Sequence, residues 1–521
     1  MIRVKNIMPL LALILLMGMI SKGLWAQEKD AKPADKPAEA AVAAPAKEES
    51  SITDHTIRIG GQTIPYKATA ATILLKNEKD EPAALLYYTA YTRSDAKDLS
   101  QRPVSFVYNG GPGSSSVWLH MGSFSPRRVI TVNAGATPPA PYKLAENPQC
   151  LLDKTDLVFI DPVGTGFSHA VGKAQDKDFW GVDQDVKSLA QFINTYVSRN
   201  TRWNSPKFLI GESYGTFRSA ALSNYLQSHD GLYFNGIVLI SSVLNLGTIS
   251  FNPGEDMPYV FYLPSYAATA WYHKVLKDRP DNLNAFLDET RKFSQAEYAA
   301  ALMKGSKLGE AEKSAVAKKL SRYTGLSEDY LIKANLRVNL PQFMKELQRG
   351  RGLTTGRLDA RFSGWSYDLL GEYAEYDPQD VAITGPFTAA FNNYVRDELK
   401  FGQDKVYHTG SDEAGNNWDW KHRGGGDNFG FPGSPNVEGD LIQAMLANPH
   451  LQVEVENGIY DLATPFFATE YTMEHLGLPE KLQKSIHLQY YDAGHMMYLR
   501  DEDLGKLKAN IASFIDGASK Q

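Results

Sequence analysis

The sequence has few of the residues and motifs that form covalent crosslinks or metal sites. It contains one cysteine, Cys150, among 521 residues. No intrachain disulfide can form, so the folded chain must be held together by the packing of its core. The sequence has no His-Glu-x-x-His pattern and no cysteine cluster, which are common signals of a zinc site. We therefore expect no metal and no cofactor.

An excess of charge of one sign is also missing. The 60 acidic and 54 basic residues give a net charge of −6, which offers no reason to expect a nucleic acid partner. Hydrophobic residues make up 43% of the chain, as in a soluble globular enzyme. The length alone is typical of two or three domains.

No apolar run is long enough to span a bilayer as a helix. Residues 8–20 are uncharged and apolar, they follow a basic start, and Ala26 offers a small residue at a cleavage point. This pattern predicts a secretory signal peptide over residues 1–26, with an uncleaved anchor as the alternative. We expect an exported protein, periplasmic or extracellular, without stable membrane insertion after cleavage. Residues 27–51, rich in Ala, Pro, Lys and Glu, predict a disordered linker.

Short apolar or alternating segments predict strands, several of which precede helical patterns. The predicted strands are 56–59, 62–66, 83–92, 103–108, 156–160, 207–210, 235–244, 451–455 and 485–491. Residues 183–199, 216–227 and 504–515 have patterns that predict helices. Strands alternating with helices indicate an α/β fold with a mainly parallel sheet flanked by helices. Active sites in such sheets lie beyond the carboxyl ends of the strands.

A largely helical, aromatic region interrupts this pattern. Its predicted helices are 266–276, 283–293, 296–303 and 310–322. We interpret residues 247–436 as a cap inserted into a catalytic domain formed by residues 52–246 and 437–518. Two interpretations stay open for the glycine-rich and aromatic stretch 418–435, which either overhangs the active site or is an ordinary surface loop.

The pentapeptide Gly211-Glu212-Ser213-Tyr214-Gly215 stands between a predicted strand and a predicted helix. Strand, Gly-x-Ser-x-Gly and helix in this order are the signature of a nucleophile elbow. The glycines let the backbone turn sharply, and the helix N-terminus favours negative charge near the serine oxygen. We therefore predict Ser213 as a catalytic nucleophile.

A serine nucleophile needs a base and a group that orients the base. On this type of sheet the partners follow in the order Ser, Asp or Glu, His. Asp461 and His495 each follow one of the last two strands, which gives the order Ser213, Asp461, His495. Asp492 is the rival carboxylate, but it is so close to His495 along the chain that we expect its side chain to point elsewhere.

Backbone N–H groups are expected to stabilise the negative charge that develops on the substrate oxygen. One donor should be Tyr214, the residue after the nucleophile. The other should come from the glycine turn 109–116, and we assign it to Gly111, where the backbone itself must approach the substrate.

Four segments resemble, in the same order, motifs of the serine carboxypeptidase family. They are residues 109–116, 161–168, 211–215 and 493–496. The resemblance spans about residues 53–514, and it implies an α/β-hydrolase fold and removal of C-terminal residues from peptides at acidic pH. It also implies that Asn109, Gly110 and Glu212 receive the C-terminal carboxylate of the substrate. Glu212 can do so only when one of the two carboxyl groups is protonated.

The chain departs from the family pattern at several positions. Val107 replaces a tryptophan, and Ser114 replaces a common cysteine. The usual Gly-Asp-x-Asp motif reads Gly458-Ile459-Tyr460-Asp461. Ser123 stands where a second glutamate commonly pairs with Glu212. Without that like-charge neighbour, we expect Glu212 to ionise at lower pH unless burial compensates.

Three functions fit these observations. The first is an exported serine carboxypeptidase-like hydrolase with peptide substrates. The second keeps the triad but hydrolyses esters or transfers acyl groups, which fold and triad cannot separate from the first. The third is a binding protein on an inactive scaffold, which is disfavoured because no triad or oxyanion position is lost.

Overall fold

The structure, a computed structural model, describes residues 46–423 and 434–520. The predicted signal peptide lies outside the described residues, as do most of the predicted linker and residues 424–433. The first strand begins at Ser50, so the last two residues of the predicted linker belong to the sheet.

In the described residues, ten strands form one sheet, in the order β1-β2-β3-β7-β4-β9-β10-β13-β14, with the short β8 (His169–Ala170) paired to β3. The strands are β1 (Ser50–Ile59), β2 (Gln62–Lys76), β3 (Pro82–Arg93), β4 (Val104–Tyr108), β7 (Asp156–Ile160), β9 (Lys207–Glu212), β10 (Gly236–Ile240), β13 (Gln452–Gly458) and β14 (Ile486–Tyr491). The first three are antiparallel, β3 is antiparallel to β7, and the strands from β7 to β14 are parallel. The predicted mainly parallel sheet is confirmed.

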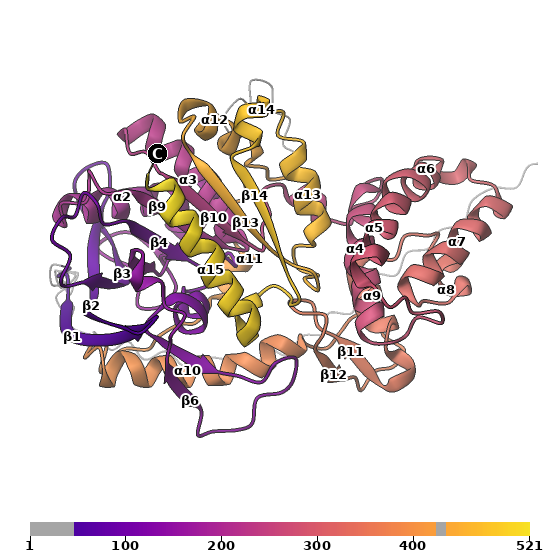
Figure 1. The fold of residues 1–521 in the computed structure, drawn as a ribbon, viewed down its shortest axis with the longest axis horizontal. Coiled ribbons are helices and arrows are strands. Elements are labelled where there is room, and N and C mark those ends of the chain that lie inside the picture. Colours follow the sequence, from indigo (N-terminus) through magenta and orange to yellow (C-terminus); the bar gives the residue numbers. More distant parts are fainter. Residues whose placement is uncertain (1–45, 424–433, 521) are drawn as a thin grey trace, which may run out of the picture. The chain divides into compact units, whose positions relative to one another are not determined.

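Alternate side chains of the central strands enter two separate cores. Phe208 and Ile210 of β9 pack on one face with helix α15 (Asp501–Ala518), which crosses the sheet in Figure 1. Leu209 packs on the other face with α2 (Val182–Arg199) and α3 (Tyr214–Asp230). Because successive strand residues point to opposite faces, an uninterrupted apolar strand is buried on both sides.

The described part of the predicted insertion 247–436, here called the inserted region, contributes to two different cores. Its first helices are α4 (Met257–Tyr272), α5 (Leu283–Phe293), α6 (Ala299–Met303), α7 (Glu310–Thr324), α8 (Glu328–Lys333) and α9 (Leu340–Glu346). They share a third core with α13 (Phe466–Glu474). Helix α10 (Pro378–Asp397) instead packs in the core beneath α15, through residues such as Phe387 and Phe391.

Helix α4 begins nine residues earlier than the predicted segment 266–276. Pro258 lies in its first turn, where a missing N–H costs little, but Pro264 lies inside the helix. Aromatic packing offsets that loss, since the Tyr266 ring stacks on Phe343 with centroids 3.8 Å apart. The helix therefore begins earlier than predicted, and it also ends earlier, at Tyr272.

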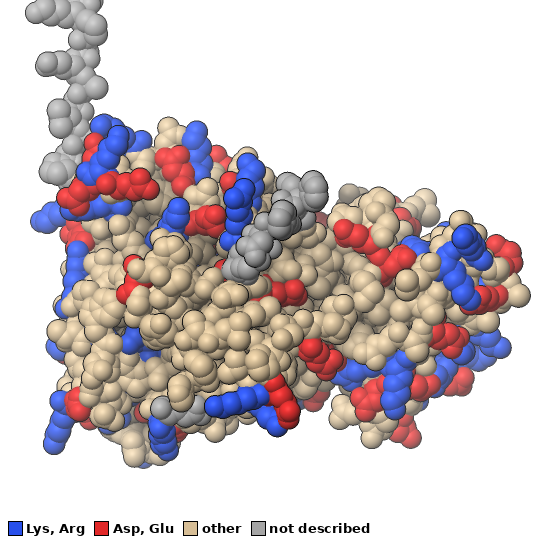
Figure 2. Space-filling model, turned by 90° about the horizontal axis from the view of Figure 1, so that it is seen from above, with Lys and Arg blue, Asp and Glu red and all other residues tan. Residues whose placement is uncertain are grey.

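On the face shown in Figure 2, basic and acidic side chains are interspersed rather than gathered by sign. None of the described helices is long and apolar enough to cross a membrane.

Candidate active site

Ser213 occupies a sharp turn between β9 and α3. Its φ of 60° and ψ of −129° are unusual for a residue with a side chain, and such strain is typical of a nucleophile elbow. A Cβ on Gly211 would lie 2.3 Å from the carbonyl oxygen of Gly215, so this turn requires glycine. Ser213 is the one residue of the pentapeptide that is not fully buried. The turn therefore presents the serine at the carboxyl end of β9.

His495 and Asp461 lie together beyond β13 and β14. The distance between His495 Nδ1 and Asp461 Oδ2 is 2.8 Å. Oδ1 of Asp461 accepts hydrogen bonds from the N–H groups of Ala463 and Thr464, at 2.7 and 2.9 Å. Burial lowers the pKa of His495, but the charge and hydrogen bond of Asp461 outweigh burial and leave this pKa raised. The carboxylate is thus held by backbone N–H groups in contact with the imidazole.

Asp492 does not reach this pair. Its side chain is 67% exposed, and its nearest cation is Arg500, at 4.0 Å. Between the two carboxylates considered from the sequence, the structure brings Asp461 to His495.

The glycine turn after β4 lies against the elbow. A Cβ on Gly110 would lie 2.4 Å from the backbone nitrogen of Tyr214, so only glycine allows this approach. Gly111 has a φ of 101°, a conformation that also favours glycine. The turn that carries Gly111 and the N-terminus of α3 are therefore neighbours, as the predicted pair of oxyanion donors requires.

Glu212 and Asn109 form a buried hydrogen-bonded pair beside the elbow. Asn109 Nδ2 donates to Glu212 Oε1 at 2.8 Å. Burial raises the pKa of Glu212 to about 7, against the charge of His495 and the hydrogen bond from Asn109. Glu212 therefore does not ionise at the lower pH that the loss of a paired carboxyl group predicted, because burial compensates and Glu212 keeps its proton below neutral pH.

Ser123 supplies no substitute for that missing carboxyl group. It is fully buried, and its hydroxyl donates to the carbonyl oxygen of Leu119 at 2.6 Å. The hydroxyl is therefore used in a hydrogen bond to the backbone four residues earlier.

A buried ion pair supports this site and was missed in the sequence. Arg218 Nε donates to Asp185 at 2.6 Å, and Nη1 of Arg218 donates to the carbonyl oxygen of Asn109 at 2.6 Å. The guanidinium lies over the rings of Tyr108 and Tyr214. The arginine inside the predicted helix 216–227 was the sequence feature that could have indicated a buried ion pair. The pair ties α2 and α3 to the loop that carries Asn109.

A turn of the inserted region holds the histidine loop. It comprises residues 356–362, between β11 (Leu353–Thr355) and β12 (Ser363–Trp365). Asp359, paired with Arg361, accepts a hydrogen bond from the N–H of Gly494 at 3.1 Å. A Cβ on Gly494 would lie 2.4 Å from Asp359 Cα, so the two segments touch through their backbones. No sequence pattern indicated this contact.

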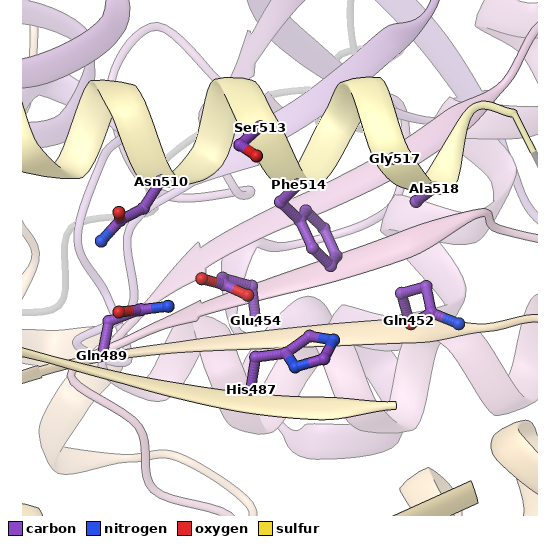
Figure 3. A pocket seen from close by; sticks show the side chains of 9 residues that line it. All are labelled: Gln452, Glu454, His487, Gln489, Asn510, Ser513, Phe514, Gly517 and Ala518. Carbon is purple, nitrogen blue, oxygen red and sulfur yellow. The ribbon is translucent and has the colours of Figure 1, made fainter. Parts of the chain in front are cut away.

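The region between β13, β14 and α15 holds a separate polar pocket, lined by Glu454, His487 and Asn510 among others (Figure 3). It lies along these elements rather than at the strand ends that carry Asp461 and His495. In the described part of the chain, no cluster of His, Cys, Asp or Glu could hold a metal ion.

Comparison with known proteins agrees with this architecture. The family profile described as serine carboxypeptidase matches residues 74–503. Pheromone-processing carboxypeptidase KEX1 of Saccharomyces cerevisiae is 29% identical over 161 residues, which cover 30% of this chain and 21% of the yeast protein. Retinoid-inducible serine carboxypeptidase of Rattus norvegicus is 27% identical over 188 residues, covering 35% and 38%. The sequence matches thus span well under half of either relative.

The solved structure of a prohormone-processing carboxypeptidase, KEX1(delta)p of Saccharomyces cerevisiae, superimposes with a TM-score of 0.55 and 19% identity. The superposition covers 87% of this chain and 91% of the yeast one, which shows a shared α/β-hydrolase fold. With the family profile matched over most of its length, this chain belongs to the serine carboxypeptidase family.

Proposed function

We propose that this protein is an exported serine carboxypeptidase that removes C-terminal residues from peptides. The observation that carries the proposal is the 2.8 Å hydrogen bond between His495 and Asp461, which lies at the same sheet edge as the strained Ser213. Family membership supports the peptide substrate, and the apolar run at residues 8–20 supports export to the periplasm or the cell exterior.

Ser213 acts as the nucleophile in this proposal. As its oxygen bonds to the carbonyl carbon of the last peptide bond, His495 takes the hydroxyl proton and Asp461 stabilises the resulting imidazolium. The N–H groups of Gly111 and Tyr214 stabilise the negative oxygen of the tetrahedral intermediate. His495 then gives the proton to the leaving nitrogen as the carbon–nitrogen bond breaks. Water, deprotonated by His495, hydrolyses the acyl-enzyme and regenerates Ser213.

Asn109, Gly110 and Glu212 receive the substrate's C-terminal carboxylate. A protonated Glu212 donates a hydrogen bond to it, whereas an ionised Glu212 repels it. The pKa of about 7 keeps this donor available in acidic and neutral solution.

The test compares wild type with Ser213→Ala and with a control, Ser228→Ala, at an exposed serine near the end of the same helix. Three matched substrates are used, namely a free-acid peptide, its C-terminal amide and its ester. We expect Ser213→Ala to lower turnover about a millionfold and to abolish labelling by a fluorophosphonate, with no effect in the control. Ester hydrolysis without cleavage of the free-acid peptide would identify an esterase. Absence of labelling in wild type would identify an inactive scaffold.

A further inference from the structure

Arg357 is an exposed cation on the turn 356–362, and its backbone is tied to the candidate catalytic loop. The N–H of Leu462, the residue after Asp461, donates to the carbonyl oxygen of Arg357 at 3.1 Å. The N–H of His495 donates to the carbonyl oxygen of the next residue, Leu358, at 2.6 Å. The turn therefore places Arg357 between the two loops that carry the orienting carboxylate and the base.

The other side of the turn is held as well. Asp377 accepts hydrogen bonds from the N–H groups of Arg357 and Leu358, at 3.1 and 2.9 Å. Asp377 also caps α10, which packs in the core beneath the sheet. In Figure 1, β11, β12 and α10 lie at the lower edge of the sheet, where β14 ends and the chain turns back into α15. The backbone of Arg357 is thus fixed from both sides.

The side chain of Arg357 has no structural partner among the described residues. It forms no ion pair and no hydrogen bond with any residue in the described ranges, although 31 ion pairs are found there. Its charge nevertheless acts on the site, because it opposes the rise in the pKa of His495. An unpaired arginine that is close enough to influence the catalytic base is available to a ligand.

A peptide substrate carries an anion close to the bond that is broken. The carboxylate of a peptide's last residue lies about one residue, or roughly 3.5 Å along an extended chain, from the bond to be broken. Guanidinium groups bind carboxylates through two parallel hydrogen bonds. We propose that Arg357 is a specificity-determining residue that binds a carboxylate of the substrate, in addition to the Asn109 and Glu212 pair. This inference rests on the proposed peptidase function.

Two carboxylates could fill this role, the C-terminal one or that of an acidic side chain beside the cleaved bond. The test therefore uses a peptide with Glu beside the cleaved bond, both as the free acid and as the matched ester. The same two substrates are also made with Gln in place of that Glu. The variants are Arg357→Ala, Arg357→Lys and a control, Arg351→Ala. Arg351 is exposed on the same inserted region, and its guanidinium donates to the carbonyl oxygen of His273 at 3.0 Å.

We expect Arg357→Ala to raise KM for the free-acid peptide by at least about tenfold, since bonds to charged groups are the stronger ones. The kcat should change little, and Arg357→Lys should restore part of the loss. Ester hydrolysis should persist in every variant, which also shows that the variants fold. A loss that follows the Glu side chain instead of the terminus would assign Arg357 to the side-chain carboxylate.

Two results would overturn the proposal. One is an equal loss on acid and ester that persists when Gln replaces Glu beside the bond, because it would mean that Arg357 only positions the His495 loop. The other is an unchanged KM for every carboxylate-bearing substrate. Failure of the proposed function is a separate outcome, because wild type would then not cleave the free-acid peptide, whether or not it hydrolyses the ester.

Discussion

Replacing Glu212 with Gln tests whether a single buried carboxyl group sets the pH range of peptide cleavage. Burial holds the pKa of Glu212 at about 7, so at pH 8 about one tenth of the molecules keep the proton. Cleavage of a free-acid peptide should therefore fall about tenfold per pH unit above 7. Hydrolysis of the matched ester lacks this loss and should rise towards neutral pH as His495 becomes a free base.

The assay measures kcat/KM against pH for both substrates and takes the ratio of acid to ester, in which the titration of His495 cancels. Glu212→Gln keeps an acceptor for Asn109 and donates at every pH, so its ratio should be flat. Glu454→Gln is the control, because burial raises the pKa of Glu454 to about 7 as well, in the pocket of Figure 3. A flat ratio in wild type, or the same fall in Glu212→Gln, would refute the role of Glu212.

Other predictions concern single side chains. Asp461→Asn should lower turnover about ten thousandfold and Asp492→Asn far less, and the reverse ranking would reassign the orienting carboxylate. Burial raises the pKa of Glu456 to about 8 from 4.5, so the folded state holds a proton that the unfolded state has lost between these values. The free energy of unfolding should fall by up to about 5 kcal/mol as pH rises through this window, and urea titrations of Glu456→Gln should lack this slope. Arg218→Met should cost about 3 to 5 kcal/mol by the same titrations, because it leaves Asp185 buried and unpaired, and an unchanged midpoint would contradict this.

The sequence alone predicted the parallel sheet and the family, and the structure and comparisons confirm both. The reason is that these features depend on local order, namely apolar strands, the glycines of the elbow, and a fixed order of strand ends. Parallel strands bring their carboxyl ends to one edge, so Ser213, Asp461 and His495 could be grouped without coordinates. The catalytic roles of these residues stay predictions for the experiments above.

The tertiary structure decided what depends on contacts between distant segments. Whether Glu212 loses or keeps its proton followed from its burial, which no motif spacing reports. The ion pair between Asp185 and Arg218 joins two helices. The turn that presents Arg357 meets the His495 loop across more than a hundred residues of chain. Such contacts leave no periodic pattern, because each is made once, by segments that only folding brings together.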